Sequence, residues 1–298
     1  GTYGRRKYGK QCRERLMKSV NLNSQLSIVG RTHEGLVRDH NEDYIADNAK
    51  LGIAVLADGM GGLNAGEVAS SMAVHLLMEE LTGYRLGNSS LPAELDSEES
   101  EMPMDSRVVR KVVQMANDAV FHTSQTLPQC KGMGTTIVAS LFYDNKLSIA
   151  HIGDSRVYRF RDNVLEQVTK DHSFVQELID KGLLTREEAR VSDKKNVVTR
   201  ALGVAPLVEV ECHEYEVEVD DVYLFCSDGL HDMVRDRDIE QAFIELSRNL
   251  PELAEYLVEL ANANGGRDNV SVILIHVAKP YPSESREGLV ERIVNWFE

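Results

Sequence analysis

The sequence predicts one α+β domain in which buried strands alternate with amphipathic helices. From Ile28 onward, short β-branched apolar runs alternate with helical patterns, and no internal repeat or linker divides the chain. Several apolar runs lack a polar face, which indicates burial on both sides, as when a sheet packs on another sheet and is also covered by helices. The 298 residues are enough for one large domain.

Strands are predicted where apolar and β-branched residues fill nearly every position of a short run. Such runs end at turn residues or charged residues, so their limits are easy to place. The predicted strands are Gly52–Ala57, Thr135–Phe142, Leu147–Ile152, Asp221–Cys226 and Val270–Val277.

Helices are predicted where apolar residues recur every three or four positions. The first follows the Gly61-Gly62 turn, with a stripe of Val68, Met72, Leu76, Ala69, Ala73 and Leu77. The later helices cover Ser106–Thr123, two short pieces within Ser173–Val191, Asp236–Leu246, Pro251–Asn262 and a final segment around Leu289–Phe297. A capping box at Thr185 to Glu188 marks the start of the second short piece.

Two segments are expected to lie outside the packed core. Residues 1–24 are basic and polar with little apolar periodicity, so we expect a disordered tail or a remnant of cloning, and a domain spanning 25–298. Residues 83–105 are rich in Ser, Pro and acidic side chains, which predicts a mobile acidic loop. Either segment could dock a partner, but solvated chain is the simpler interpretation.

The composition excludes several classes of protein. A formal net charge of -15 argues against a nucleic-acid partner, because affinity for the phosphate backbone comes mostly from Lys and Arg. No apolar run is long enough to cross a membrane, and the four cysteines have neither CxxC spacing nor histidines at zinc-ligand distance. We therefore expect a cytoplasmic protein with reduced thiols and no membrane partner.

Carboxylates placed at strand ends carry the chemical signal. Asp58 and Asp228 each end an apolar strand and are followed at once by glycine, Asp154 follows the Leu147 strand, and Asp268 precedes the last strand. The ends of some antiparallel strands lie beside the starts of others, so these acids can meet at one rim. Four acids there repel one another strongly unless cations lie among them.

Oxygen ligands without His or Cys favour Mg²⁺ or Mn²⁺ over zinc. The glycine after each acid permits positive φ and would let a carbonyl, such as that of Gly59, turn toward a hard cation. Asp-Gly is also a common turn, which explains any one of these motifs but poorly explains the whole set. Before the first predicted strand, Arg38 offers a bidentate grip on phosphate, with Glu42 and Asp43 close behind. A surface ion pair is the alternative role for Arg38.

An ordered series of motifs closely resembles the metal-dependent protein phosphatases of type 2C, in their compact bacterial form. It spans roughly residues 26–278, nearly the whole domain. The motifs are Arg38-x-x-Asn-Glu-Asp43, Asp58-Gly-Met-Gly-Gly62, Gly134-Thr-Thr136, Gly153-Asp-Ser-Arg156, Asp171-His-Ser173, Thr199-Arg-Ala-Leu-Gly203, Ser227-Asp-Gly229 and Gly266-Arg-Asp-Asn269.

The resemblance implies a β-sandwich of two antiparallel sheets flanked by helices on both sides (α-β-β-α), with a small helical flap at about 172–196. It implies that Asp58 bridges two divalent cations, Mn²⁺ or Mg²⁺, that Gly59 adds its carbonyl to one and that Asp228 and Asp268 bind the other. Asp154 would join Asp228 at a weaker third cation. Glu42 and Asp43 would ligate directly or through water, and Arg38 would bind the substrate phosphate.

The implied activity is hydrolysis of phosphoserine and phosphothreonine monoesters on proteins by a metal-bridging hydroxide, without a covalent intermediate. A serine/threonine kinase and its targets are the expected partners of a monomeric enzyme. Met60 occupies a position where some family members have a histidine proposed to protonate the leaving group, so a water on the third cation or His40 would replace it. A catalytically idle scaffold and another two-metal hydrolase, such as a nuclease, are the competing hypotheses.

Overall fold

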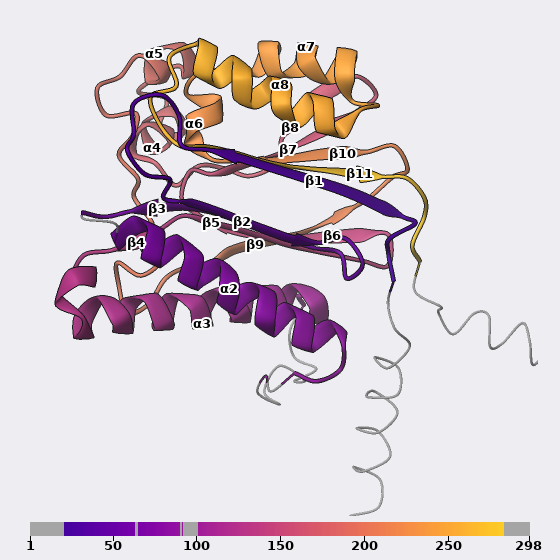
Figure 1. Cartoon of the computed structure of the whole chain (residues 1–298), viewed down its shortest axis with the longest axis horizontal. Coiled ribbons are helices and arrows are strands. Elements are labelled where there is room, and N and C mark those ends of the chain that lie inside the picture. The colour runs from indigo at the N-terminus through magenta and orange to yellow at the C-terminus, as the bar shows by residue number, and fades with distance from the viewer. Residues whose placement is uncertain (1–20, 63–64, 90, 92–100, 283–298) are drawn as a thin grey trace, which may run out of the picture.

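Two antiparallel sheets are stacked face to face between two pairs of helices (Figure 1). The structure is a computed structural model and describes residues 21–62, 65–89, 91 and 101–282. The N-terminal residues 1–20, the middle of the predicted acidic loop (90 and 92–100) and the predicted helix at 289–297 lie outside the described residues.

Each sheet combines strands that are distant along the chain. The first sheet has the order β1-β11-β10-β7-β8, formed by Leu26–His33, Val270–Val277, Val222–Cys226, Arg156–Arg161 and Val164–Gln167. The second has the order β2-β3-β5-β6-β9, formed by Asp43–Asn48, Ile53–Met60, Ile137–Tyr143, Lys146–Ile152 and Glu211–Glu216, and the short β4 (Gly134–Thr135) also pairs with β3.

Three apolar clusters join the layers. The two sheets bury Phe142, Tyr223 and Phe225 between them, and the rings of Phe142 and Tyr223 meet edge to face at 5.8 Å. On the outside, α2 (Ala65–Arg85) and α3 (Met104–Thr126) cover the second sheet, whereas α7 (Asp236–Leu246) and α8 (Leu250–Ala263) cover the first. Strands buried on both faces explain the uninterrupted apolar runs, and the α-β-β-α arrangement implied by the resemblance is confirmed.

Several limits differ from those predicted. Leu22 is buried between the sheets and its backbone N–H donates to Lys50 O at 2.8 Å, so the packed domain begins before residue 25. Helix α2 runs through Gly83 to Arg85 and α3 begins at Met104, which narrows the interval available to the acidic loop. The predicted stripe of α2 is also shifted, because Val68 is exposed and the buried positions continue to Leu81.

Five strands were not predicted, namely β1, β2, β7, β8 and β9. Each carries polar or charged residues at many positions, and β8 and β9 have only partly buried or exposed residues apart from Cys212. Four of them, β1, β2, β8 and β9, lie at the edges of the sheets and lack the continuous apolar signal of β3 or β11. β7 lies between β10 and β8, but its three arginines interrupt the apolar run. The first strand predicted from the sequence, Gly52–Ala57, therefore corresponds to β3, the third strand along the chain.

The remaining helices lie at one end of the sandwich. α4 (Phe174–Asp180) and α5 (Arg186–Arg190) are the two short helices expected in the flap, and the capping box between Thr185 and Glu188 is confirmed. α6 (Asp228–His231) follows β10 directly.

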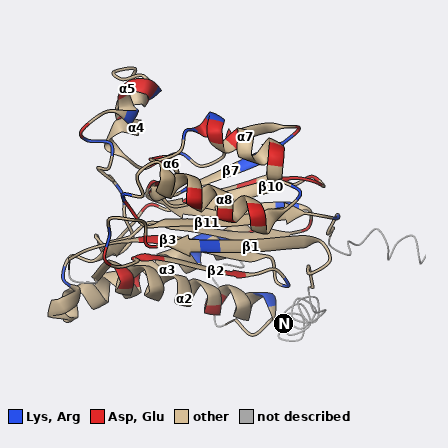
Figure 2. Ribbon diagram, turned by 45° about the horizontal axis from the view of Figure 1, so that its top comes forward, with Lys and Arg blue, Asp and Glu red and all other residues tan. Residues whose placement is uncertain are grey.

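Acidic side chains are spread over α7 and α8 (Figure 2). None of the helices within the described residues is both long and apolar enough to cross a membrane.

Candidate active site

The acids predicted at strand ends meet at one end of the sandwich. Asp43 begins β2 and lies opposite Asp58 of β3 in the antiparallel register. Ser227, which directly follows β10 of the other sheet, donates from Oγ to Asp43 Oδ2 at 2.7 Å. Asp228 follows Ser227 as the first residue of α6, so acids from both sheets share this rim.

Burial and mutual repulsion make these carboxyls hard to ionise. Desolvation raises the pKa of Asp58 well above its ordinary value, and the charges of Asp43, Asp228, Asp154 and Asp268 raise it further. The pKa of Asp228 is raised in the same way, first by burial and then by the charges of Asp154 and Asp268. Burial also raises the pKa of Asp43 to about 6 and that of Asp154 to about 7. The described residues of the protein do not offset the burial and the mutual repulsion of these carboxylates.

Buried carboxylate oxygens without a hydrogen-bond donor indicate which kind of ligand the site would bind. Asp43 Oδ1 and Asp228 Oδ1 are buried and have no hydrogen-bond donor among the described residues. A buried carboxylate oxygen without a donor is costly, and a bound cation removes that cost. Carboxylate oxygens are the ligands that Mg²⁺ and Mn²⁺ prefer, so the residues present fit the predicted pair of cations.

The glycines after Asp58 and Asp228 allow close backbone packing. A Cβ on Gly59 would lie 2.1 Å from Gly66 O, and one on Gly229 would lie 1.9 Å from Asn269 O. Neither glycine is among the positive-φ residues, so the expected need for positive φ is wrong at both positions. Their role in the fold is to bring the start of α2 and the segment before β11 against the two acids.

Asn269 holds the loop that precedes β2. Its side chain accepts from Glu42 N at 2.8 Å and donates from Nδ2 to Glu34 O at 2.9 Å and to His40 O at 2.8 Å. These bonds fix the backbone on both sides of Arg38. No pattern in the sequence assigns Asn269 a role, although it directly follows Asp268.

Arg38 and Glu42 already have partners. Arg38 Nη2 donates to Asp268 Oδ2 at 2.8 Å, and this hydrogen bond and the charge of Asp268 raise the pKa of Arg38. Its side chain is 53% exposed, so the guanidinium is open to solvent beside the acids. The carboxyl of Glu42 accepts a hydrogen bond from the backbone of Gly66, which directs it toward the start of α2. Burial nevertheless raises the pKa of Glu42.

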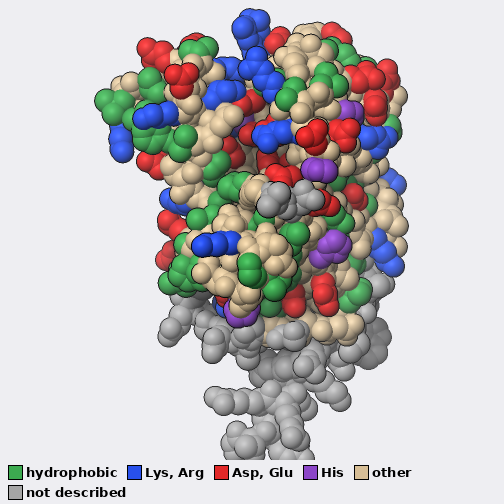
Figure 3. Space-filling model, turned by 60° about the vertical axis from the view of Figure 1, so that its left-hand side comes forward, with side chains coloured by type: hydrophobic (Ala, Val, Ile, Leu, Met, Phe, Trp, Pro, Cys, Tyr) green, Lys and Arg blue, Asp and Glu red, His purple; other side chains and the backbone are tan. Residues whose placement is uncertain are grey.

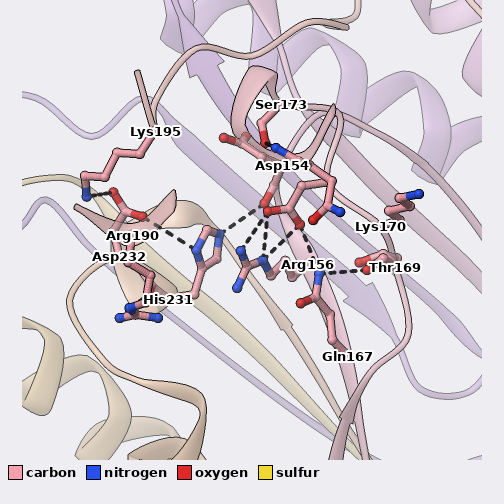
Figure 4. A network of polar contacts seen from close by, with 12 residues as sticks. Asp154, Arg156, Gln167, Thr169, Lys170, Ser173, Arg190, Lys195, His231 and Asp232 are labelled. Carbon is pink, nitrogen blue, oxygen red and sulfur yellow. Dashed lines mark hydrogen bonds and ion pairs between the residues drawn. The ribbon is translucent and has the colours of Figure 1, made fainter. Parts of the chain in front are cut away.

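Asp154 lies in a network of polar contacts whose other members were not predicted as site residues (Figure 4). His231 is buried, which lowers its pKa well below the ordinary value, and its neutral ring donates from Nε2 to Asp154 O at 3.0 Å. Nearby, Arg156 makes a bidentate pair with Asp171, and Lys195 of the flap pairs with Asp232. A histidine at the end of a four-residue helix carries no pattern that would have revealed this contact.

A second group of possible metal-ligand atoms lies near the start of the flap. One nitrogen each of His151 and His172 and an oxygen of Glu211 lie within 4.8 Å of one another. The two rings are stacked, with centroids 4.8 Å apart and an interplanar angle of 8°. A histidine binds a metal in the plane of its ring, and stacked rings do not direct their lone pairs at one point. His172 instead bonds Gly153 N and Glu211, and so joins the flap to β6 and β9.

Comparison with known proteins decides the family. The model of the protein phosphatase 2C family matches residues 29–263, which is most of the chain. The chain belongs to this family. The family member "Serine/threonine phosphatase stp" of Listeria monocytogenes is 38% identical over 248 residues, covering 82% of this chain and 93% of that protein. The phosphatase PstP of Mycobacterium tuberculosis is 40% identical over 255 residues, covering 85% of this chain and 45% of that protein.

Solved structures of protein phosphatase 2C relatives have the same architecture. The Mycobacterium tuberculosis serine/threonine phosphatase PstP/Ppp superposes with a TM-score of 0.72 at 38% identity, covering 86% of this chain and all of that one. The catalytic domain of PstP in complex with two manganese ions also gives 0.72 at 38% identity, covering 86% and 99%. The fold, the assignment as a metal-dependent serine/threonine protein phosphatase and the expected pair of divalent cations are thereby confirmed for this chain's family.

Proposed function

We propose that this chain removes phosphate from phosphoserine and phosphothreonine of other proteins, at the rim where Asp43, Asp58, Asp154, Asp228 and Asp268 meet. The observation that carries the proposal is the pair of buried, donor-free oxygens Asp43 Oδ1 and Asp228 Oδ1 in a cluster of acids beside Arg38. The relatives named above are serine/threonine phosphatases, and one was solved with two manganese ions.

In this proposal Asp58, the backbone carbonyl of Gly59, Asp228 and Asp268 would together hold the two divalent cations. Asp154 and Asp228 would hold a weaker third cation, which fits the rise in the pKa of Asp228 that the charge of Asp154 causes. Asp43 is the better of the two ligand candidates before β3, because Oδ1 has no donor whereas the carboxyl of Glu42 accepts from Gly66. Glu42 then acts through water.

When bound, two divalent cations supply an activated water and neutralise charge on the phosphoryl group. Arg38 binds the non-bridging oxygens of the phosphate, since its exposed guanidinium already lies against Asp268. Met60 lacks an ionisable group, so the leaving serine or threonine oxygen takes its proton from water. His40 lies in the same loop as Arg38, with an exposed side chain, and is the alternative donor.

We also propose a cytoplasmic, monomeric enzyme that acts on a serine/threonine kinase and its targets. The serine/threonine phosphatases among its bacterial relatives support phosphorylated proteins as substrates, and a serine/threonine kinase would produce such substrates.

Three substrates distinguish the proposal from its competitors. The enzyme should hydrolyse p-nitrophenyl phosphate and a phosphothreonine peptide with Mn²⁺, lose both activities in EDTA and leave a phosphodiester intact. Preferential cleavage of the diester would establish a different two-metal hydrolase, and absence of all turnover with bound Mn²⁺ would establish an idle scaffold.

A further inference from the structure

A groove leads away from the candidate active site along the flap. Its volume is about 490 Å³, and residues 190–196 of the flap form one side. The other side comes from the segments after α6 and after α8, including Asp232, Asn264 and Arg267.

The groove is continuous with the catalytic rim. A neighbouring cavity of about 120 Å³ is lined by Asp154 and Asp228 and shares Arg190, Lys195 and Asp232 with the groove. The chain connects the two as well, because Asp232 N donates to Asp228 O at 2.8 Å and Arg267 directly precedes Asp268. A peptide whose phosphate lies at the acids therefore has the groove as a path for its flanking residues.

The groove is cationic in a strongly acidic protein. Three cations line it, Arg190, Lys195 and Arg267, against two carboxylates, Asp193 and Asp232. The whole chain has a formal net charge of -15. On the face that carries the site, Lys and Arg side chains gather beside a hollow with Asp and Glu (Figure 3). An anionic peptide repelled by the rest of the surface would be attracted here.

The three cationic side chains differ in the partners that they already have within the protein. Lys195 is paired with Asp232, so it ties the flap to the body of the protein. Arg190 makes only a long contact from Nη2 to His231 O, at 3.5 Å. Within the described ranges, neither Arg190 nor Arg267 has a carboxylate within ion-pair distance. Two guanidinium groups thus remain available to a ligand.

We propose that Arg190 and Arg267 select substrates with acidic side chains next to the phosphorylated residue. This inference rests on the proposed function and names a specificity surface for it. A guanidinium donates two parallel hydrogen bonds to the carboxylate of Asp or Glu, or to the oxygens of a second phosphate. The partner is an acidic phosphopeptide, and the flap positions one of the two cations that read it.

Matched phosphothreonine peptides with acidic, neutral or basic flanks test the inference, each flank being varied on the N-terminal and on the C-terminal side. The wild-type enzyme should show kcat/KM roughly three- to tenfold higher for an acidic flank than for a neutral one, on at least one side. Arg267→Glu should reverse the order so that the basic flank is preferred. Arg190→Glu provides a second variant in case the first does not fold.

Arg248→Glu is the matched control, because Arg248 is exposed beyond α7 and does not line the groove. It should keep the wild-type ratio of acidic to basic kcat/KM. A wild-type ratio of one, or charge reversal at both arginines without a change in the ratio, would overturn the inference. Turnover of p-nitrophenyl phosphate by the wild type separates this failure from failure of the proposed function, which would abolish that activity too.

Discussion

At the scale of single residues, the site depends on carboxylates that the protein buries without neutralising. Asp58 is flanked by Asp43 across the strand pair and by Asp228 from the other sheet, and each raises its pKa. Arg38 lies at the exposed edge of the site, where it donates a hydrogen bond to Asp268 and lowers the pKa of Glu42. Such an arrangement is unfavourable for folding and is retained where it serves a site.

Removing one of these acids should abolish catalysis while relieving the repulsion. We expect Asp228→Ala to lower kcat for p-nitrophenyl phosphate with Mn²⁺ by about a thousandfold or more, because a metal ligand is lost. Asp58→Ala should behave alike. Calorimetric titration with Mn²⁺ checks the cause, since the heat of the tight sites should fall with the activity. A variant with normal Mn²⁺-dependent turnover would exclude that acid from the centre.

Arg38 should contribute chiefly through the phosphate. We expect Arg38→Ala to lower kcat/KM by roughly a hundredfold, the loss of one donor to a developing charge, with partial recovery in Arg38→Lys because lysine keeps the charge but loses the fork. Inhibition by inorganic phosphate should weaken in parallel. If Arg38→Ala bound phosphate as well as the wild type, the arginine would be only the ion-pair partner of Asp268.

At the scale of elements, the sequence could predict the strands that are buried on both faces, because β3, β5, β6, β10 and β11 have no polar side to obscure the signal. It could not predict the edge strand β9, whose Glu211, His213 and Glu216 alternate with few apolar residues. The acids of the site were found because they stand at the ends of the detectable strands. Ser227 and Asn269 were missed, because polar supports acquire meaning only when the neighbouring strand is placed.

Gly229 allows α6 to pack closely against the segment before β11, and a substitution of this glycine tests that packing. We expect Gly229→Ala to destabilise the fold by about 3 kcal/mol or more, since the new Cβ would lie 1.9 Å from a backbone oxygen that cannot rotate away. Gly62→Ala is the control, because no atom of the described residues lies within 4 Å of its Cβ position. Urea unfolding compares them, and equal midpoints for the two variants would contradict the packing described.

At the scale of the whole molecule, the acids connect the two sheets. Asp43 and Asp58 belong to β2 and β3 of one sheet, whereas Asp228 and Asp268 adjoin β10 and β11 of the other. Without cations, repulsion among them opposes the stacking of the sheets at this end. Because cations bind the folded site, their removal should lower the stability of the entire sandwich.

The pH dependence of the metal-free protein gives a sharp test of this repulsion. The pKa of Asp154 is about 7 in the fold and 3.8 ordinarily, so the folded state holds a proton that the unfolded state releases. Its contribution to stability is fully present below about pH 4 and is lost as pH rises toward 7. Asp154→Asn cannot ionise and avoids the loss.

In EDTA we therefore expect Asp154→Asn to match the wild type near pH 4 and to exceed its free energy of unfolding at pH 8, by on the order of 2 kcal/mol. With saturating Mn²⁺ at pH 8 the advantage should shrink or reverse, because the ionised carboxyl then has a cation to bind. Thermal and urea unfolding at both pH values measure it. An advantage independent of pH would mean that the substitution acts through packing, and that Asp154 is not one of the acids whose charge the cations must offset.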